Sequence, residues 1–174
     1  MVINGQSLLT AAPIKNMLTT KVKEHGVSHG LAEVGYDIRL KQDVRFWGGH
    51  IFIGDFNEDQ LTSEGKFCIA SAIEQFDMPQ DLVGIVHDKS TWARQGLSVF
   101  NTVIEPGWKG FLTLELVYHG NDDLYIPAGA GIAQVIFHHI SDSGQYEGKY
   151  QNQADEPVKA RIHKADGSGE FHQY

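Results

Sequence analysis

Short runs of alternating hydrophobic and polar residues recur along most of the chain. They lie at residues 36–40, 44–47, 50–54, 66–70, 82–87, 97–104, 111–119, 124–128 and 132–140. A period of two is typical of strands that bury one face. Turn-forming residues separate several of the runs, at 105–107, 119–122 and 127–129. Many short strands at regular spacing favour an all-β sandwich or barrel over repeated βαβ units.

The two ends of the chain follow other patterns. Residues 6–24 predict a weak helix with a break near Pro13, and the Gly-rich residues 25–35 predict a loop. From Ser141 onward the chain is polar and poor in aliphatic residues. This tail, about 141–174, is either frayed or a segment that closes over a ligand. We find no internal repeat, so we expect one domain over residues 1–174.

Composition excludes some function classes. A chain of 174 residues is long enough for one domain with a core, and its hydrophobic fraction of 41% is ordinary. The net charge of −8 argues against DNA or RNA as the main ligand, because nucleic-acid binders need a basic face. A small phosphorylated ligand needs only a local cluster of cations and remains possible.

Cysteine content and hydropathy bear on where the protein works. Cys68 is the only cysteine, so no intramolecular disulfide forms, which suits a reducing cytoplasm. The N-terminal residues lack the pattern of a signal peptide. No apolar stretch approaches the roughly 20 residues that a membrane-spanning helix needs. We therefore expect a cytoplasmic protein with no membrane partner.

One carboxylate stands inside an apolar run. Glu115 lies in FLTLELV, where alternation puts Leu112 and Leu114 on one face and Thr113 and Glu115 on the other. The bland interpretation is a strand carboxylate paired with an arginine. The functional interpretation is a general base whose pKa is raised by burial, which disfavours the charged form.

A cluster of cations and hydroxyls precedes this run. Lys89, Ser90, Thr91 and Arg94 supply the donors that a polyphosphate needs. The alternative is a solvated turn with a helix N-cap at Ser90. No Walker A pattern occurs, so we expect no P-loop chemistry. Glu105, just before Pro-Gly, sits in a turn or binds a sugar hydroxyl.

The nine histidines raise the question of a metal site. His138 and His139 are adjacent on a predicted strand and point to opposite faces, so they cannot chelate one ion together. No H-E-x-x-H motif occurs. The two-cysteine signature of the zinc deaminases is impossible with one cysteine. We expect no protein-bound catalytic zinc.

Several of these motifs together resemble the deoxycytidine triphosphate (dCTP) deaminase branch of the dUTPase-like superfamily. The matching segments appear in consistent order over about residues 34–162, which is more specific than any one motif. They are VGYDIRL at 34–40, STWARQGL at 90–97, IEPGWKGFLTLEL at 104–116, IPAG at 126–129 with IAQ at 132–134, and YEGKYQNQ at 146–153.

This resemblance implies an all-β, dUTPase-like distorted β-barrel or jelly-roll-like domain, with a short N-terminal helix and a mobile C-terminal lid. It also implies a homotrimer with sites at subunit interfaces. The implied reaction is dCTP plus water giving dUTP and ammonia. Glu115 would be the catalytic acid and base, Ser90 would help to hold the water, and Arg94 would orient Glu115 or stabilise charge.

The resemblance further implies a substrate-binding set. Lys89, Thr91, Lys149 and Gln153 would hold the triphosphate with its Mg²⁺. Glu105 would bind the 3′-hydroxyl of the sugar, and Tyr146 would belong to the closing tail. The remaining candidates are Thr102, Trp108, Thr113 and Leu114. The ligands expected are dCTP and dUTP, with dTTP as a possible inhibitor.

The chain departs from the deaminase pattern at three places. Lys89 replaces the usual arginine, Glu105 replaces the usual aspartate, and residues 99–104 are about two positions shorter, at the length typical of dUTPases. Two other functions therefore stay open. One is dUTP pyrophosphatase activity, alone or combined with deamination, with Glu105 activating the water. The other is a non-catalytic nucleotide sensor on the same fold.

Overall fold

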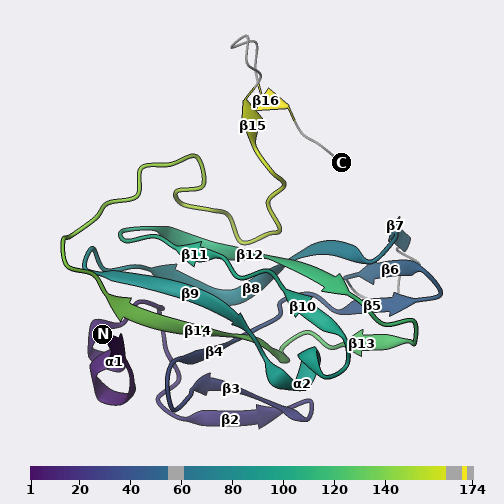
Figure 1. Ribbon diagram of the computed structural model, residues 1–174, viewed down its shortest axis with the longest axis horizontal. Helices are drawn as coiled ribbons and strands as arrows, with labels where there is room; N and C mark the ends of the chain where they lie inside the picture. Colours follow the sequence, from purple (N-terminus) through teal and green to yellow (C-terminus); the bar gives the residue numbers. More distant parts are fainter. Residues whose placement is uncertain (55–60, 164–169, 172–174) are drawn as a thin grey trace.

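The computed structural model describes residues 1–54, 61–163 and 170–171 (Figure 1). Its helices are α1 (Gly5–Ala11) and α2 (Ser90–Ala93). Its strands are β1 (Val2–Ile3), β2 (Lys21–Glu24), β3 (Val27–Leu31), β4 (Tyr36–Arg39), β5 (Val44–Trp47), β6 (His50–Ile53), β7 (Leu61–Glu64), β8 (Phe67–Asp77), β9 (Leu82–Asp88), β10 (Leu97–Val99), β11 (Val103–Ile104), β12 (Lys109–Tyr118), β13 (Leu124–Ile126), β14 (Gly131–His139), β15 (Ile162–His163) and β16 (Glu170–Phe171). Each alternating run of the sequence contains a strand, so the all-β prediction is confirmed.

The strands are paired antiparallel in separate sheets. Among the described residues, the largest sheet has the order β11-β9-β14-β4-β3-β2, with β1 also paired to β14. A second sheet has the order β10-β12-β8, a third has the order β13-β5-β6-β7, and β15 pairs with β16. These sheets do not close into a barrel. The expected all-β domain is therefore confirmed, as separate sheets packed together without a closed barrel.

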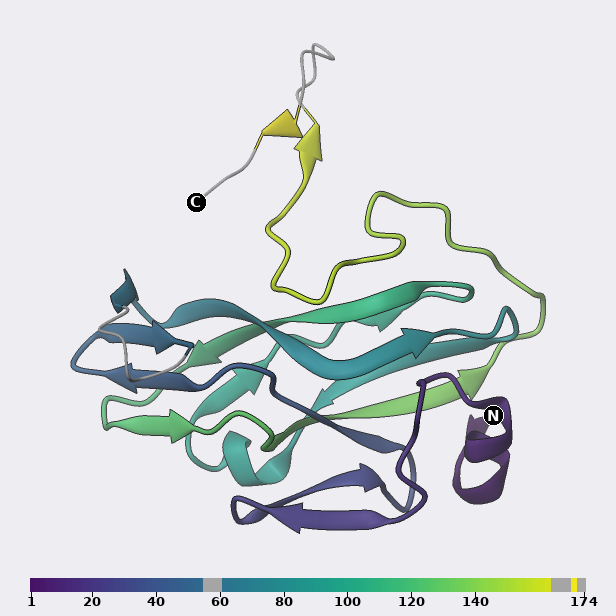
Figure 2. The ribbon, with the colours of Figure 1, turned by 180° about the vertical axis from the view of Figure 1, so that it is seen from behind.

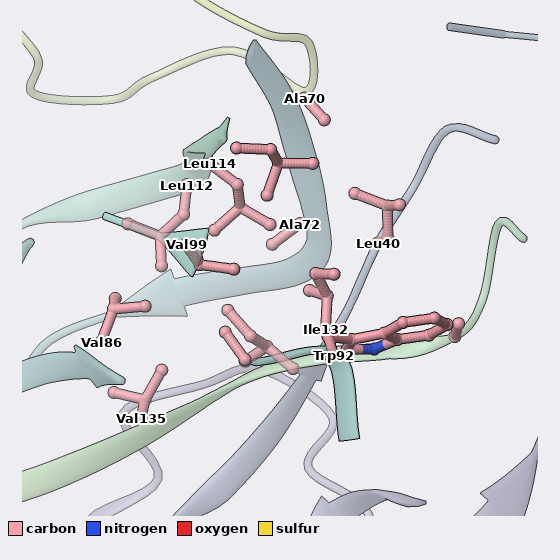
Figure 3. Close-up of a cluster of buried hydrophobic side chains, with 14 of the residues drawn as sticks. Leu40, Ala70, Ala72, Val86, Trp92, Val99, Leu112, Leu114, Ile132 and Val135 are labelled. Atoms are coloured by element: carbon pink, nitrogen blue, oxygen red, sulfur yellow. The ribbon is translucent and has the colours of Figure 1, made fainter. Parts of the chain in front are cut away.

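The core lies between the sheet of β12 and the sheet of β14. Figure 3 shows Val99 and Leu114 on one side of it, facing Val86 and Val135 on the other. Along β12 buried residues alternate with partly exposed ones, as the period-two pattern predicts. The inner face of β12 therefore belongs to the core, and the outer face is free to build a site.

Polar contacts join the two sheets at a further point. The side-chain Nε of Arg39 on β4 donates to Glu74 Oε1 on β8 at 2.8 Å, and the backbone nitrogen of Arg39 donates to Oε2, also at 2.8 Å. Glu74 is almost fully buried. A buried carboxylate requires such partners, because it has lost its water. This ion pair fixes β4 against β8 and so helps to set the position of β12.

The N-terminal prediction was partly wrong. The helix α1 ends at Ala11, because Ala12 adopts a left-handed conformation and Pro13 cannot continue a helix. Residues 21–24 form β2, and the expected loop at 25–35 contains β3. Both residues of the connecting turn, His25 and Gly26, have positive φ. This is the geometry that joins two short antiparallel strands in a tight hairpin.

The tail crosses the outer face of β12 and then leaves the body of the molecule. Figure 2 shows this path from behind, with β15 and β16 projecting away from the other sheets. Up to residue 163 the tail has few residues in regular strands, but it makes many hydrogen bonds to the turn before β12 and to β12 itself. No helix in the described part of the chain is long and apolar enough to cross a membrane.

Candidate active site

Glu115 lies near the middle of β12, on the strand face that points away from the core. Its neighbour across the ladder on β8 is Ile69, and Thr113 on the same face lies opposite Ser71. Leu114 and Leu116, the flanking residues, are buried in the core. The pattern of the sequence thus holds in the structure. The Glu115 carboxylate thus lies on the outer face of β12, and the residue paired with it on β8 is apolar.

The environment of Glu115 favours its protonated form. Burial raises the pKa of the Glu115 carboxyl above its ordinary value, although a backbone hydrogen bond acts in the opposite direction. Its Oε2 is buried and has no hydrogen-bond partner among the described residues. A buried carboxylate oxygen without a partner is costly. Glu115 is therefore ready to accept a hydrogen bond or a proton from a group that enters the site.

A cavity of about 1020 Å³ opens over this face of β12. Seven of the residues expected at the site line it: Thr102, Glu105, Trp108, Thr113, Glu115, Tyr146 and Gln153. They come from the residues on either side of β11, from the turn before β12, from β12 itself and from the tail. Segments up to about 50 positions apart in the sequence therefore meet at one hollow large enough for a nucleotide.

The turn before β12 forms one wall. The backbone nitrogen of Trp108 donates to the carbonyl of Glu105 at 3.1 Å, with Pro106 and Gly107 between them. Gly107 has a φ of +72°, and a Cβ there would lie 2.6 Å from the side chain of Gln145. Pro followed by Gly at positive φ is typical of a type II turn. The turn leaves the Glu105 side chain exposed at the cavity.

The tail forms a second wall, beside the turn. Gln153 donates from Nε2 to the hydroxyl of Thr113 at 2.6 Å, and Trp108 donates from Nε1 to the carbonyl of Tyr150 at 2.7 Å. Gly110 pairs with Gln153 in an isolated bridge, and a Cβ at Gly110 would lie 2.6 Å from the Gln153 backbone nitrogen. In this structure the tail is docked along β12, as the ligand-closing interpretation requires.

The cation-hydroxyl cluster lies elsewhere. Ser90 and Thr91 on α2 and Arg94 at its C-cap are exposed and do not line the cavity. Figures 1 and 2 show α2 on the side of the molecule opposite to the tail. The N-cap of α2 is Lys89, so the alternative with an N-cap at Ser90 is off by one residue. One copy of the chain does not bring Arg94 to Glu115.

Three other expected residues are also outside the cavity lining. The Lys89 ammonium group is held by Asp37 and Ser28. Lys149 donates to the carbonyl of Arg161 and lies 5.2 Å from the centre of the Tyr150 ring. The Leu114 side chain is buried in the core. None of these three side chains is directed at Glu115 in this arrangement.

The cavity also contains residues that sequence reasoning missed. They are Ile53, Glu64, Gly65, Lys66, Phe67, Cys68, Ile69, Val103, Leu112, Tyr150, Val158, Lys159 and Ala160. Tyr150 carried a signal, since it belongs to the tail motif. Phe67 and Ile69 carried none, because their place beside β12 depends on strand register. Burial raises the pKa of the Cys68 thiol to about 12, so this cysteine is not an activated nucleophile.

A metal ion held by the protein alone has no evident ligand set here. The described residues contain no group of three or more His, Cys, Asp or Glu side chains placed to bind one ion. Mg²⁺ is commonly held through one or two carboxylates and the phosphates of a substrate. The site is therefore compatible with magnesium that arrives bound to a triphosphate.

Comparison with known proteins gives a consistent answer. Residues 8–140 match the model of the family described as dCTP deaminase-like. The dCTP deaminase of Campylobacter hominis is 34% identical over 163 residues, covering 80% of this chain and 86% of that protein. In all, 355 curated proteins match this chain.

Solved structures show the same fold at low sequence identity. The 2′-deoxycytidine 5′-triphosphate deaminase of Agrobacterium tumefaciens superposes with a TM-score of 0.57 at 16% identity, over 79% of this chain and 48% of that one. The dUTPase of Staphylococcus bacteriophage 80alpha superposes with a TM-score of 0.50 at 14% identity, over 86% of this chain and 95% of that one. These likenesses confirm the dUTPase-like fold.

Proposed function

Since the chain belongs to the dCTP deaminase-like family, we propose that it hydrolyses dCTP to dUTP and ammonia, with Glu115 as the catalytic acid and base. The observation that carries the assignment of Glu115 is its partnerless oxygen, buried beside the cavity on the outer face of β12. A general base needs direct access to the proton that it takes, and a raised pKa brings a carboxyl group closer to working pH.

In this reaction the Glu115 carboxylate transfers two protons, one after the other. Glu115 takes a proton from water as the oxygen attacks C4 of the cytosine ring, and it passes that proton to N3. It then carries the remaining hydroxyl proton to the amino group, so that the C4–N4 bond breaks and ammonia leaves. The apolar wall around Ile69 supports this role, because exclusion of bulk water strengthens the electrostatic interactions that stabilise charge in the site.

The remaining residues are assigned to the sugar, the base and the triphosphate of the substrate. Glu105 binds the 3′-hydroxyl of the deoxyribose, with Trp108 and Thr102 beside the sugar and the base. Gln153 and Lys149 from the tail, with Thr91 from α2 of a second copy of the chain, bind the triphosphate and its magnesium, which offsets phosphate charge. Tyr146 closes the cavity with the tail, which makes residues 141–163 a lid. dTTP carries the same triphosphate and is the candidate inhibitor.

Ser90 and Arg94 reach the site from a second copy of the chain, in a homotrimer. Support comes from the placement of α2 outside the cavity lining and from apolar side chains left uncovered at the cavity. Phe67 is 51% exposed and Val103 is 56% exposed, and both line the cavity. The ring of Phe100 lies 6.2 Å from that of Phe67. A neighbouring subunit would cover this patch and bring its own α2 to Glu115.

Product analysis tests the reaction. The protein is incubated with dCTP or with dUTP in the presence of Mg²⁺, and nucleotides, ammonia and pyrophosphate are measured. Deamination alone converts dCTP to dUTP with one ammonia per turnover and leaves dUTP intact. No ammonia from dCTP, with binding intact, would instead identify a nucleotide sensor.

A second activity has one observation in its favour. Glu105 is exposed at the cavity, directly before the turn of Pro106 and Gly107. In that position a carboxylate can also activate water for attack on the α-phosphate. Release of pyrophosphate from dUTP would show that the enzyme is bifunctional, and its loss in Glu105→Gln with ammonia release retained would assign the second activity to Glu105.

Subunit mixing tests the shared site. Glu115→Gln and Arg94→Ala are each expected to be nearly inactive. If each site takes Glu115 from one subunit and Arg94 from another, mixed trimers contain some sites with both residues intact, and activity returns on mixing. Light scattering gives the oligomeric state. A monomeric active enzyme, or trimers that exchange subunits without recovery, would rule out the shared site.

A further inference from the structure

The ammonium group of Lys89 is buried in an ion pair that the proposed chemistry does not use. Its Nζ lies 2.5 Å from Asp37 Oδ2 and 3.1 Å from the Ser28 hydroxyl. The Lys89 side chain is 12% exposed and that of Asp37 is 3% exposed. The Ser28 hydroxyl also donates to the same Asp37 oxygen at 3.1 Å. Two of the three donors of this ammonium are therefore occupied inside the protein.

Lys89 is also the N-cap residue of α2. Its carbonyl accepts hydrogen bonds from the backbone nitrogens of Trp92, at 3.0 Å, and Ala93, at 3.1 Å. Trp92 is buried and donates from Nε1 to the carbonyl of Gly131 at 2.7 Å. Two inward side chains thus hold a turn whose other residues, including Ser90 and Arg94, point outward.

A buried cation and a buried carboxylate constrain each other. Each has lost its hydration, so separating them leaves a costly unpaired charge. The second oxygen of Asp37 has no partner within the described residues, so Lys89 is its main source of neutralisation. Asp37 lies on β4, between β14 and β3 in the largest sheet, which makes it a rigid anchor.

We propose that Asp37 is a positioning residue of the deaminase site, acting through Lys89 to hold α2 so that Ser90 and Arg94 have fixed places. This inference rests on the proposed function for its kinetic consequence. Lys89 then serves the geometry of α2 instead of binding the triphosphate. The chemical step, more than nucleotide binding, depends on the pair.

The test compares variants of the pair in the full-length protein. Asp37→Asn keeps the shape and removes the charge, Lys89→Met removes the cation, and Lys89→Arg restores a cation for Asp37. Asp123→Asn is the matched control, because it removes one charge of an exposed ion pair between Asp123, just before β13, and Arg45 on β5, at 2.6 Å. Each variant is measured for kcat and KM with dCTP.

Fluorine NMR supplies a readout that does not need turnover. The chain contains Trp47, Trp92 and Trp108, and labelling with 5-fluorotryptophan gives one signal for each. The signal of Trp92 reports on α2, and that of Trp47, which is 55% exposed on β5, serves as the internal reference. Assignment uses a Trp92→Phe protein.

Asp37→Asn and Lys89→Met are expected to lower kcat on the order of 100-fold, the cost typical of a small misplacement of catalytic groups. KM should stay within about threefold, which separates chemistry from binding. The Trp92 signal should shift or broaden while that of Trp47 stays. Lys89→Arg and Asp123→Asn should retain kcat within about threefold.

The opposite pattern would overturn the proposal. If Lys89 binds phosphate, Lys89→Met raises KM at unchanged kcat, and the Trp92 signal does not move in Asp37→Asn. If Asp37→Asn does not fold, the paired variant Asp37→Asn/Lys89→Met removes both charges and carries the same expectations. If the unmodified protein releases no ammonia from dCTP, the proposed function fails, and the Trp92 signal alone still decides whether Asp37 holds α2.

Discussion

Gln153 in the tail donates a hydrogen bond of 2.6 Å to the hydroxyl of Thr113, two residues along β12 from Glu115. The same hydroxyl accepts a hydrogen bond from the backbone nitrogen of Val158 at 2.9 Å. One side chain on the strand of Glu115 thus accepts two hydrogen bonds from the tail. The tail is therefore joined directly to the strand face that bears Glu115.

Deletion of the tail after Ser143 should leave a folded protein that binds dCTP poorly. The core strands keep their contacts, but the cavity loses Tyr146, Tyr150 and Gln153. We expect KM for dCTP to rise by at least about tenfold, the loss of one or two good hydrogen bonds. Circular dichroism checks folding. Limited proteolysis should cut the tail of the full-length protein less when a dCTP analogue is bound, and equal cutting would contradict its role as a lid.

A point variant tests the docking of the tail without removing it. Gly110→Ala places a Cβ 2.6 Å from the backbone nitrogen of Gln153, so the tail must move away from β12. Gly49→Ala is the control, because Gly49 also has positive φ but has open space around it. Proteolysis of the tail should become faster in Gly110→Ala and stay unchanged in Gly49→Ala. The same rate in both variants would show that the tail is not held there.

Replacement of Glu115 tests the acid-base mechanism. Glu115→Gln keeps the shape of the side chain but can neither take nor return a proton. We expect ammonia release to fall by at least about 100-fold, the low end for a positioned acid-base group, with the dissociation constant for dCTP nearly unchanged. Isothermal titration calorimetry measures this dissociation constant. Near-normal turnover in this variant would exclude Glu115 as the base.

The same variant should change how stability depends on pH. Burial raises the pKa of Glu115 in the folded state, so between the unfolded and folded values the native protein binds more protons. The contribution of Glu115 to the free energy of unfolding is therefore fully present below the pKa that Glu115 has in the unfolded chain. This contribution is lost as the pH rises through the pKa that Glu115 has in the folded protein. The melting temperature of Glu115→Gln should exceed that of the unmodified protein at pH 7–8, and the difference should close toward pH 4.5. A difference in melting temperature that does not change with pH would contradict the raised pKa of Glu115.

The expected requirement for magnesium can be tested separately from a requirement for zinc. A protein with one cysteine cannot form the two-cysteine site of the zinc deaminases. We expect activity to survive dialysis against a zinc chelator once Mg²⁺ is restored, because magnesium accompanies the triphosphate. Elemental analysis is the control. Stoichiometric zinc, with activity lost on its removal and regained on its return, would refute this expectation.

The short connection between β10 and β11 bears on base specificity. Only residues 100–102 separate the two strands, and the carbonyl of Thr102 already accepts a hydrogen bond from the backbone nitrogen of Val86 at 3.1 Å. That carbonyl is less available to read the base edge. We expect 5-methyl-dCTP to react with kcat/KM within about tenfold of dCTP, the low end of what one methyl group discriminates. A preference for dCTP of about a thousandfold would show that the pocket is closed at that edge.

The sequence alone determined what depends on neighbours along the chain. The alternation of 111–119 placed Glu115 on the outer face of β12, because successive side chains of a strand point to opposite faces. Pro106 and Gly107 predicted the turn beside Glu105 for a similarly local reason. The ordered series of motifs indicated the family and, through it, the fold.

Only the tertiary structure decided what depends on pairing across the chain. The register of β8 against β12 puts Ile69 beside Glu115, and no local pattern records that register. Lys89 and Asp37 are 52 positions apart, so their contact follows from how β4 and β9 sit in one sheet. A cation that the sequence led us to expect at a phosphate is paired here with a buried carboxylate. Short strands such as β3 form because a neighbouring strand completes their hydrogen bonds, which residue preferences alone do not reveal.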